Sequence, residues 1–190
     1  MLRMLEIDPS NTYYLSEPLK EKLKPQINNK CDILKKIKDG ENNMNDIKVL
    51  KINDNNILND ALEIRKKVFT DEKSVPRNIE HDKYDESLDL CDHFIIIYND
   101  IKVGTLRCLN VGDNTVKLQR FCFLKDYRNL GLGKKTLTFI EDFYKNQGIN
   151  SIIMDAKYQV SGFYEKCGYI KRSEIFVEAG IEHVKMSKNL

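Results

Sequence analysis

The sequence lacks a paired arrangement of cysteines. Its five cysteines are an odd number, and no two of them are spaced as in a CxxC motif. A disulfide scaffold and a zinc site are therefore both unfavourable interpretations. Thiols inside apolar stretches, such as those of Cys108 and Cys122, are typical of buried side chains. We expect a reducing compartment, the cytoplasm, and no metal ion.

Long hydrophobic runs are also absent. The longest strongly apolar stretch is FIIIY at 94–98, whereas a membrane-spanning helix needs about 20 apolar residues. The opening residues, MLRMLEIDPS, carry Glu6 and Asp8 where a signal peptide would have an apolar segment. We therefore expect neither secretion nor insertion into a membrane.

An excess of one charge is missing as well. The 190 residues include 31 basic and 29 acidic side chains, for a formal net charge of +2. Nucleic acids and anionic membranes favour strongly basic surfaces, so this balance argues against either as the main partner. The hydrophobic fraction of 41% is sufficient for a folded core, and the length suits one domain plus an extension.

Residues 1–44 differ in composition from the rest of the chain. They are rich in Lys, Asn, Asp and Glu, and Pro25 and Gly40 interrupt them. The stretch CDILKKIKD at 31–39 has the pattern of a short amphipathic helix. The simpler interpretation of the whole segment is a mobile extension rather than a functional arm. We place one domain at residues 45–190.

Residues 45–190 predict a mixed α/β fold. Strands are expected at 47–52, 93–98, 101–111, 114–124 and 150–156, with a final pair within 173–189. Helices are expected at 57–69, 132–148 and 161–168. Asn99 and Asp100 should form a hairpin turn, with a bulge at Gly104. The result is a largely antiparallel sheet with one strand–helix–strand crossover, which is too irregular for a doubly wound nucleotide-binding fold.

The stretch YRNLGLGKKT at 127–136 combines glycines with cations directly after a predicted strand. A Walker phosphate loop would need Gly at 128 and Ser or Thr at 135, where this chain has Arg128 and Lys135. A dinucleotide motif, G-x-G-x-x-G, fails at Thr136. Both nucleotide-binding interpretations are therefore excluded by individual positions.

An R-x-x-G-x-G pattern remains, and it suits a pyrophosphate. The amides at a helix start are unpaired donors, and Gly131 and Gly133 let the backbone approach an anion. Arg128 and Lys134 add positive charge. An ordinary helix-start turn with solvated lysines explains the same residues, and spacing alone leaves both interpretations open.

Two segments together resemble a known family. VKLQRFCFLKDYRNLGLGKKTL at 116–137 is similar to the coenzyme A segment of the GNAT superfamily of N-acetyltransferases, whose signature is [QR]-x-x-G-x-[GA] after a strand. FYEKCGY at 163–169 is similar to the family's FYEKLGF segment. Residues 64–93 and 174–186 further resemble the ElaA/YjcF-like branch. The resemblance implies the GNAT fold, in which a mixed, largely antiparallel sheet is flanked by helices and a splayed strand pair binds acetyl-CoA.

The resemblance also implies a chemistry. An amine attacks the acetyl group of acetyl-CoA directly, without an acyl-enzyme, so no cysteine needs to be a nucleophile. Tyr164 stands at the family's tyrosine and is expected to be the general acid. The residues expected to contact acetyl-CoA lie on the strand, on the turn and in the position where many members carry an asparagine: Phe121, Cys122, Phe123, Arg128, Asn129, Leu130, Gly131, Leu132, Gly133, Lys134 and Lys157.

The general base is not in its usual place, because Gln119 occupies the position where many members carry a glutamate. The base must come from elsewhere or from water. Glu80 and Asp82, in the acidic loop at 70–92, are the candidates, since clustered carboxylates attract an amine and one with a raised pKa could take its proton. Other residues expected at the acceptor site are Arg65, Glu72, Asp85, His93, Glu178 and His183.

The acceptor is expected to be a primary amine of a small molecule. An amino-sugar phosphate such as glucosamine 6-phosphate is the leading candidate, with its phosphate bound by Arg65, Lys66 or Arg77. The alternatives are a polyamine, a protein N-terminus, or a module that binds acyl-CoA without catalysis. The resemblance also allows a homodimer.

Overall fold

The computed structural model describes residues 46–190, so the extension and short helix expected within 1–44 lie outside the described residues. The described part is built on one eight-stranded sheet with the order β1-β2-β3-β4-β5-β8-β6, and β7 pairs with β8. Its strands are β1 (Ile47–Lys51), β2 (Asp92–Tyr98), β3 (Ile101–Gly112), β4 (Thr115–Phe123), β5 (Ser151–Lys157), β6 (Ile170–Lys171), β7 (Phe176–Glu178) and β8 (Ile181–Asn189).

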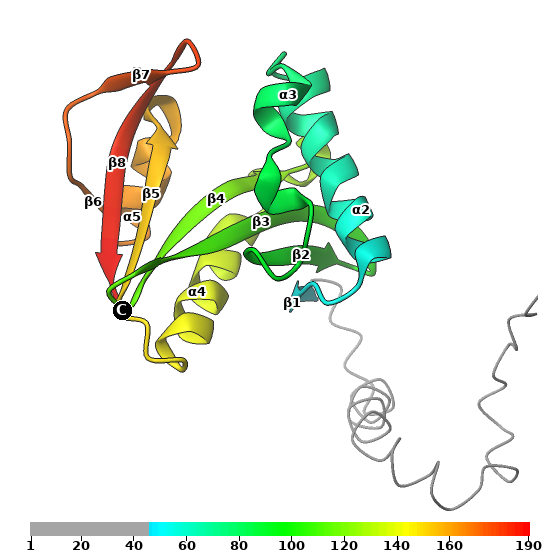
Figure 1. The fold of residues 1–190 in the computed structure, drawn as a ribbon, viewed down its shortest axis with the longest axis horizontal. Coiled ribbons are helices and arrows are strands. Elements are labelled where there is room, and N and C mark those ends of the chain that lie inside the picture. Colours follow the sequence, from blue (N-terminus) through cyan, green and yellow to red (C-terminus); the bar gives the residue numbers. More distant parts are fainter. Residues whose placement is uncertain (1–45) are drawn as a thin grey trace, which may run out of the picture. The chain divides into compact units, whose positions relative to one another are not determined.

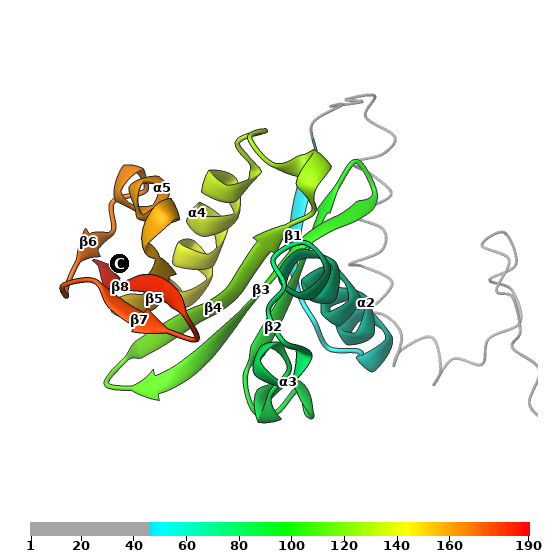
Figure 2. The same cartoon turned by 90° about the horizontal axis from the view of Figure 1, so that it is seen from above.

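Helices cover both faces of this sheet (Figures 1 and 2). The helix α2 (Asn55–Arg65) continues into a π-helical segment, η2 (Lys66–Asp71), and with α3 (Arg77–Glu80) lies on one face. On the other face lie α4 (Leu132–Lys145) and α5 (Ser161–Lys166). Single 3₁₀ turns are η3 (Lys83–Asp85), η4 (Lys125–Tyr127) and η5 (Tyr158–Val160). No helix within residues 46–190 is long and apolar enough to cross a lipid bilayer.

Strand alternation divides the apolar residues into two cores. Phe94 and Ile96 of β2 pack with α4 and α5, whereas Ile95 between them packs with α2. Because successive side chains of a strand point to opposite faces, a buried strand supplies both cores at once. Asp54 fixes the start of α2, since its carboxylate accepts hydrogen bonds from the amides of Asn56 and Ile57.

The hairpin between β2 and β3 confirms the predicted turn. Asn99 and Asp100 have φ angles of 49° and 62°, the left-handed conformation of a two-residue hairpin loop. The register shifts by one residue beside Gly104, where a bulge was predicted. A Cβ on Gly104 would lie 2.7 Å from the carbonyl oxygen of Cys122, so this glycine also allows β3 and β4 to approach closely.

The strands β4 and β5 are the parallel neighbours in the sheet, and they pair only at their beginnings. Three residue pairs join them, from Thr115↔Ser151 to Lys117↔Ile153. Beyond these pairs β4 stays with β3, and β5 stays with β8 over seven pairs. The two halves of the sheet therefore diverge in a V, which Figure 1 shows between β4 and β5. The splayed strand pair predicted from the sequence is confirmed.

A bulge in β4 accompanies this divergence. Thr105 pairs with Cys122 and Arg107 pairs with Gln119, so Arg120 and Phe121 together oppose a single residue of β3. Arg120 has a φ of 54°, which is uncommon for a residue with a side chain. A bulge bends its strand and increases the local twist, and here it lies where β4 leaves β5.

Candidate active site

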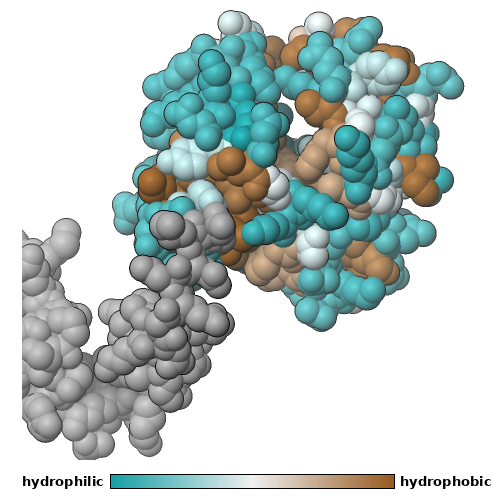
Figure 3. Space-filling view, turned by 180° about the vertical axis from the view of Figure 1, so that it is seen from behind, coloured by the Kyte–Doolittle hydropathy of each residue, from teal (hydrophilic) through white to brown (hydrophobic). Residues whose placement is uncertain are grey.

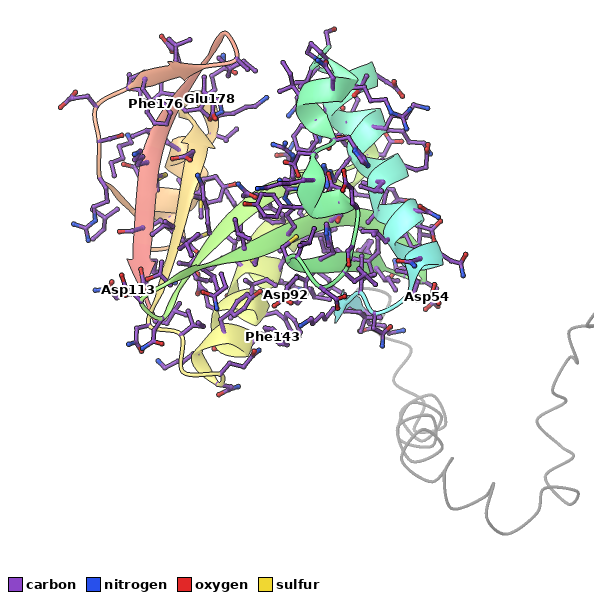
Figure 4. All side chains as sticks on the ribbon, in the orientation of Figure 1. Asp54, Asp92, Asp113, Phe143, Phe176 and Glu178 are labelled. Carbon is purple, nitrogen blue, oxygen red and sulfur yellow. The ribbon has the colours of Figure 1, made fainter. Side chains whose placement is uncertain are left out.

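The opening between the two halves of the sheet forms a cleft. Seen from behind, the surface is hollowed between the side of α2 and α3 and the side of β5 and β8 (Figure 3). Phe176 and Glu178 lie at the end of the β5–β8 half that borders this opening (Figure 4). The residues around the cleft come from the ends of β4 and β5, the start of α4, and the loops on either side.

The start of α4 is an uncapped helix end. Its N-cap is Gly131, with a φ of 75°, and no side chain within residues 46–190 accepts a hydrogen bond from the first amides. Those amides are donors without an intrahelical partner, and together with the helix dipole they favour an anion. A Cβ on Gly133 would lie 3.0 Å from the ring of Phe163, so this glycine lets α5 pack against the first turn of α4.

Arg128 is held by its neighbours at the turn before α4. Its Nε donates to the carbonyl oxygen of Phe123 at 3.0 Å, and its two terminal nitrogens each donate to Glu72 at 2.6 Å. The hydrogen bonds from Arg128 lower the pKa of Glu72, and the same contact raises the pKa of Arg128. Glu72, which was expected to bind the acceptor, instead neutralises the arginine that was expected to bind phosphate.

The second half of β4 presents a free edge toward the cleft. Beyond Lys117 this strand has no pairing partner on the β5 side within the described residues. Phe121 and Phe123 pack edge to face, with their ring centroids 5.4 Å apart. Cys122 between them is buried, and desolvation raises its thiol pKa to about 12, so it stays protonated. A protonated, buried thiol is poorly suited to act as a nucleophile at this position.

Tyr164 lies in α5 and is buried between two aromatic rings. Its ring contacts Phe163 and Tyr169 at centroid distances of 5.0 Å and 6.0 Å. Desolvation raises the pKa of Tyr164, so its phenol is protonated at neutral pH. Within residues 46–190 its hydroxyl forms no hydrogen bond, which leaves the proton free to be donated to a ligand.

The acidic loop is held to the domain by a buried ion cluster. Arg65 is 1% exposed; its Nε contacts the carboxylate of Glu80, and one terminal nitrogen donates to Asp85 at 2.9 Å. The same nitrogen donates to the carbonyl oxygen of Glu80 at 2.6 Å. All three side chains are buried, so the guanidinium of Arg65 is committed to the loop. This burial argues against the substrate contacts expected of Arg65 and Asp85.

A second arginine extends the cluster to the strands. Arg107 of β3 donates to Asp82 at 2.7 Å, to Asp85 at 2.9 Å and to the side-chain oxygen of Gln119 at 3.1 Å. Arg120, at the β4 bulge, donates to Asp82 at 3.3 Å and to the main-chain oxygen of Glu80 at 3.1 Å. The carboxylates at positions 80, 82 and 85 thus tie the loop to the bulge.

The pKa shifts in the cluster oppose the direction expected for a base. Burial raises the pKa of Asp82, but the hydrogen bonds and charge of Arg107 outweigh it and lower the value. Burial likewise raises the pKa of Asp85, and Arg65 outweighs this effect to bring it to about 2. Carboxylates so held are weak bases.

His93 is also a buried structural side chain. It is 2% exposed, and its Nε2 lies 2.9 Å from the carbonyl oxygen of Tyr84 and 3.2 Å from the sulfur of Cys91. Desolvation lowers the pKa of His93, which keeps the ring neutral. Its burial argues against the acceptor contact expected from the sequence.

The other half of the sheet places Lys157 and His183 side by side. They are direct partners across β5 and β8, so their side chains share one face. The ammonium group of Lys157 lies 6.0 Å from the centre of the Phe69 ring, and His183 stacks on Phe176 at 6.0 Å. Glu178 is exposed near the end of this β7–β8 hairpin.

Several residues of the site were not anticipated. Arg107 and Arg120 hold the bulge, and Phe69 with Lys73 borders the cleft. A signal existed for Arg107, since it is a lone charge inside the apolar strand VGTLRCLNV, and such charges require buried partners. Phe69 and Lys73 carried no comparable signal.

The family is shown by comparison with known proteins. Residues 65–190 match the acetyltransferase (GNAT) domain. A Bacillus subtilis relative whose name proposes acetyltransferase activity is 42% identical over 140 residues, covering 74% of this chain and 95% of its own. A second Bacillus subtilis relative, the N-acetyltransferase YjcF, described as uncharacterized, is 33% identical over 133 residues, covering 70% of this chain and 92% of its own.

The fold comparison agrees. The crystal structure of Escherichia coli ElaA superimposes with a TM-score of 0.65 at 22% identity, covering 76% of this chain and 99% of that one. The splayed strands, the uncapped helix start and the sequence relatives point to one family. The chain belongs to the GNAT superfamily and is an acyl-CoA-dependent N-acetyltransferase.

Proposed function

We propose that this protein transfers the acetyl group of acetyl-CoA directly to a primary amine of a small molecule. The observation that carries the proposal is the divergence of β4 and β5 after three residue pairs, beside a helix start without a side-chain cap. A linear thioester with a phosphorylated end suits that combination, because the strands leave an open edge and the helix start favours an anion.

The residues proposed to hold acetyl-CoA fall into two groups. The free edge of β4 offers main-chain groups at Phe121, Cys122 and Phe123, and the turn at 128–134 offers the amides of the helix start. The coenzyme supplies an acyl group activated as a thioester. We assign Arg128 to holding the turn rather than to phosphate contact, because Glu72 and Phe123 occupy its donors.

Tyr164 is proposed as the general acid. Its phenol carries a proton at neutral pH, and its hydroxyl has no competing acceptor within residues 46–190. The proton would go to the departing thiolate. Positioning of the two substrates, rather than covalent chemistry by the protein, supplies most of the remaining rate enhancement in such a reaction.

The proton of the amine is proposed to leave through water. Glu80 and Asp82 stay the sequence-based candidates for a base, yet both carboxylates face arginines. Asp82 is the more accessible of the two, with 32% of its side chain exposed against 5% for Glu80. If either carboxylate relays the proton, the geometry favours Asp82.

The leading acceptor is an amino-sugar phosphate such as glucosamine 6-phosphate. The guanidinium of Arg65 is buried, which argues against a contact with the phosphate of this acceptor. The other two candidates for that contact, Lys66 and Arg77, lie beside Glu63 and Glu80. A polyamine or a protein N-terminus is the alternative substrate. A module that binds acyl-CoA without turnover is the alternative of another class.

The decisive experiment is thiol release from acetyl-CoA with a panel of amino sugars, amino-sugar phosphates, polyamines and peptides. Thiol that appears with one amine class only, matched by acetylated product in mass spectrometry, supports the proposal. Tight coenzyme A binding without turnover on any amine would instead identify a non-catalytic binding module.

A further inference from the structure

Two lysines from different parts of the chain border one aromatic ring at the cleft. The ammonium group of Lys73, in the loop after η2, lies 5.9 Å from the centre of the Phe69 ring, and that of Lys157, at the end of β5, lies 6.0 Å from it. Each contact is at the outer limit of a cation–π interaction. The ring thus brings together two like charges from opposite sides of the opening.

Neither lysine has a counter-ion in the part of the chain that the structure describes. Within residues 46–190, no ion pair or hydrogen bond engages the ammonium group of Lys73 or Lys157. Glu72, next to Lys73, uses both carboxylate oxygens on Arg128. Desolvation, followed by the charge of Lys73, lowers the pKa of Lys157, as expected for a cation that lacks a counter-ion.

Two other partly buried lysines of the sheet have acidic partners. Lys117 of β4 pairs with Asp155 of β5, and Lys188 of β8 donates to Glu141 at 2.6 Å. The partly buried Lys157, unlike these two lysines, has no acidic partner within residues 46–190. The exposed Lys73 and the partly buried Lys157 together raise the local positive potential, which attracts anions.

The pair lies on the side of the sheet away from the helix that is proposed to bind the coenzyme phosphates. Ile152, Met154 and Ala156 of β5 are buried in the core with α4, so Lys157, by alternation, points to the opposite face. That face carries Phe69 and is shared by His183. An anion bound there would belong to the acceptor rather than to the pyrophosphate.

We infer that Lys73 and Lys157 bind an anionic group, a phosphate or a carboxylate, on the acetyl acceptor, with the Phe69 ring as the apolar surface beneath it. This inference rests on the proposed acetyl transfer and narrows its substrate to amines that also carry an anion. A polyamine is disfavoured, because its second ammonium group would meet two like charges. His183, beside Lys157, is placed to add a hydrogen bond to the same ligand.

A binding experiment tests the inference without turnover. Inorganic phosphate is titrated by calorimetry into protein saturated with coenzyme A. We expect millimolar binding by the natural chain, loss of at least tenfold in affinity in the K73Q/K157Q double variant, and retention in Lys145→Gln, which removes an exposed charge at the far end of α4. Absence of phosphate binding, or equal binding by the double variant, would overturn the inference.

A kinetic experiment distinguishes an anionic group on the acceptor from the phosphates of the coenzyme as the ligand of the two lysines. Glucosamine 6-phosphate and glucosamine are compared as acceptors, with Lys157→Arg as the charge-retaining control. The expected result is a fall of tenfold or more in the preference for the phosphorylated sugar with Lys157→Gln, with the KM for acetyl-CoA unchanged. A rise in the KM for acetyl-CoA instead would assign the lysines to the coenzyme and refute the inference. If the natural chain acetylates no amine, the proposed function is refuted. The phosphate titration would still test whether Lys73 and Lys157 bind an anion.

Discussion

Glu72 accepts a hydrogen bond from each terminal nitrogen of Arg128, both at 2.6 Å, and so joins the loop after η2 to the turn before α4. The Nε of Arg128 donates a hydrogen bond to the carbonyl oxygen of Phe123, the last residue of β4. Arg128 therefore stands where three segments of the cleft meet. Its role in this structure is to hold the turn in place.

This role predicts matched effects of Glu72→Gln and Arg128→Gln. Each should raise the KM for acetyl-CoA by at most about fivefold, because an exposed ion pair contributes under about 1 kcal/mol. The double variant should be no worse than Arg128→Gln alone, as expected for partners in one contact. Steady-state kinetics measure all three. A tenfold rise confined to Arg128→Gln would show direct contact with phosphate.

Tyr164→Phe should lower kcat by about 10² or more, since a positioned general acid contributes 10²- to 10⁴-fold. The KM for acetyl-CoA and the thermal unfolding midpoint should change little, because the ring keeps its contacts and its hydroxyl has no partner within residues 46–190. Thiol release and differential scanning fluorimetry provide the two measurements. A kcat within threefold of the natural value would remove Tyr164 from the role.

Asp82→Asn tests whether the loop supplies a base. If the amine proton leaves through water, the acidic limb of the pH–rate profile keeps its shape and only the amplitude falls, through a loosened Arg107. Glu80→Gln serves as the buried comparison. Loss of the limb in Asp82→Asn alone would identify Asp82 as the base.

The buried ion cluster predicts that the free energy of unfolding falls at acidic pH. The pKa of Asp85 is lowered to about 2 in the folded protein, so its contribution is present above the unfolded value near 4 and is lost as the pH falls toward 2. Asp85→Asn should lower the free energy of unfolding at pH 7 by about 3–5 kcal/mol, because it leaves Arg65 short of a buried partner.

Urea unfolding at several pH values checks this prediction for Asp85. The loss of stability between pH 4 and pH 2 should be smaller in Asp85→Asn than in the natural chain. Asp113→Asn, in the exposed turn between β3 and β4, is a control that should leave the pH dependence unchanged. Identical pH dependence in the two variants would show that Asp85 does not carry the effect.

Gly131→Ala should lower the free energy of unfolding by about 1 kcal/mol, since a left-handed conformation costs a side chain that amount even in open space. Gly131→Asn should cost less, because asparagine tolerates this conformation. Gly162→Ala, in α5 with only a 3.9 Å contact to Glu165, should be neutral or stabilising. Chemical denaturation that ranks these three variants otherwise would contradict the geometry.

Much of the fold could be predicted because local patterns agree with it. The Asn99–Asp100 turn and the bulge at Gly104 each act within a few residues, and the structure has them where they were expected. The end of α4 was predicted less well. The helix was expected to reach residue 148 but ends at Lys145.

The site was harder to predict because its contacts join distant parts of the chain. The segment at 70–92 was expected to be a loop, yet it contains α3 and η3, which are fixed by Arg65, Arg107 and Arg120 rather than by their own periodicity. Sequence spacing found the turn at 128–134. It could not show that Glu72 is the partner of Arg128, since 56 residues separate them.

Because only three residue pairs join β4 and β5, hydrogen exchange along β4 should report whether a ligand fills the cleft. Amides on the unpaired edge of β4 face solvent when the cleft is free, and they should exchange their hydrogens quickly. Any occupant that bonds to this edge would slow that exchange. Hydrogen–deuterium exchange over 118–123 would therefore rank acyl-CoA ligands by how fully they fill the V, even for ligands whose acyl group is never transferred.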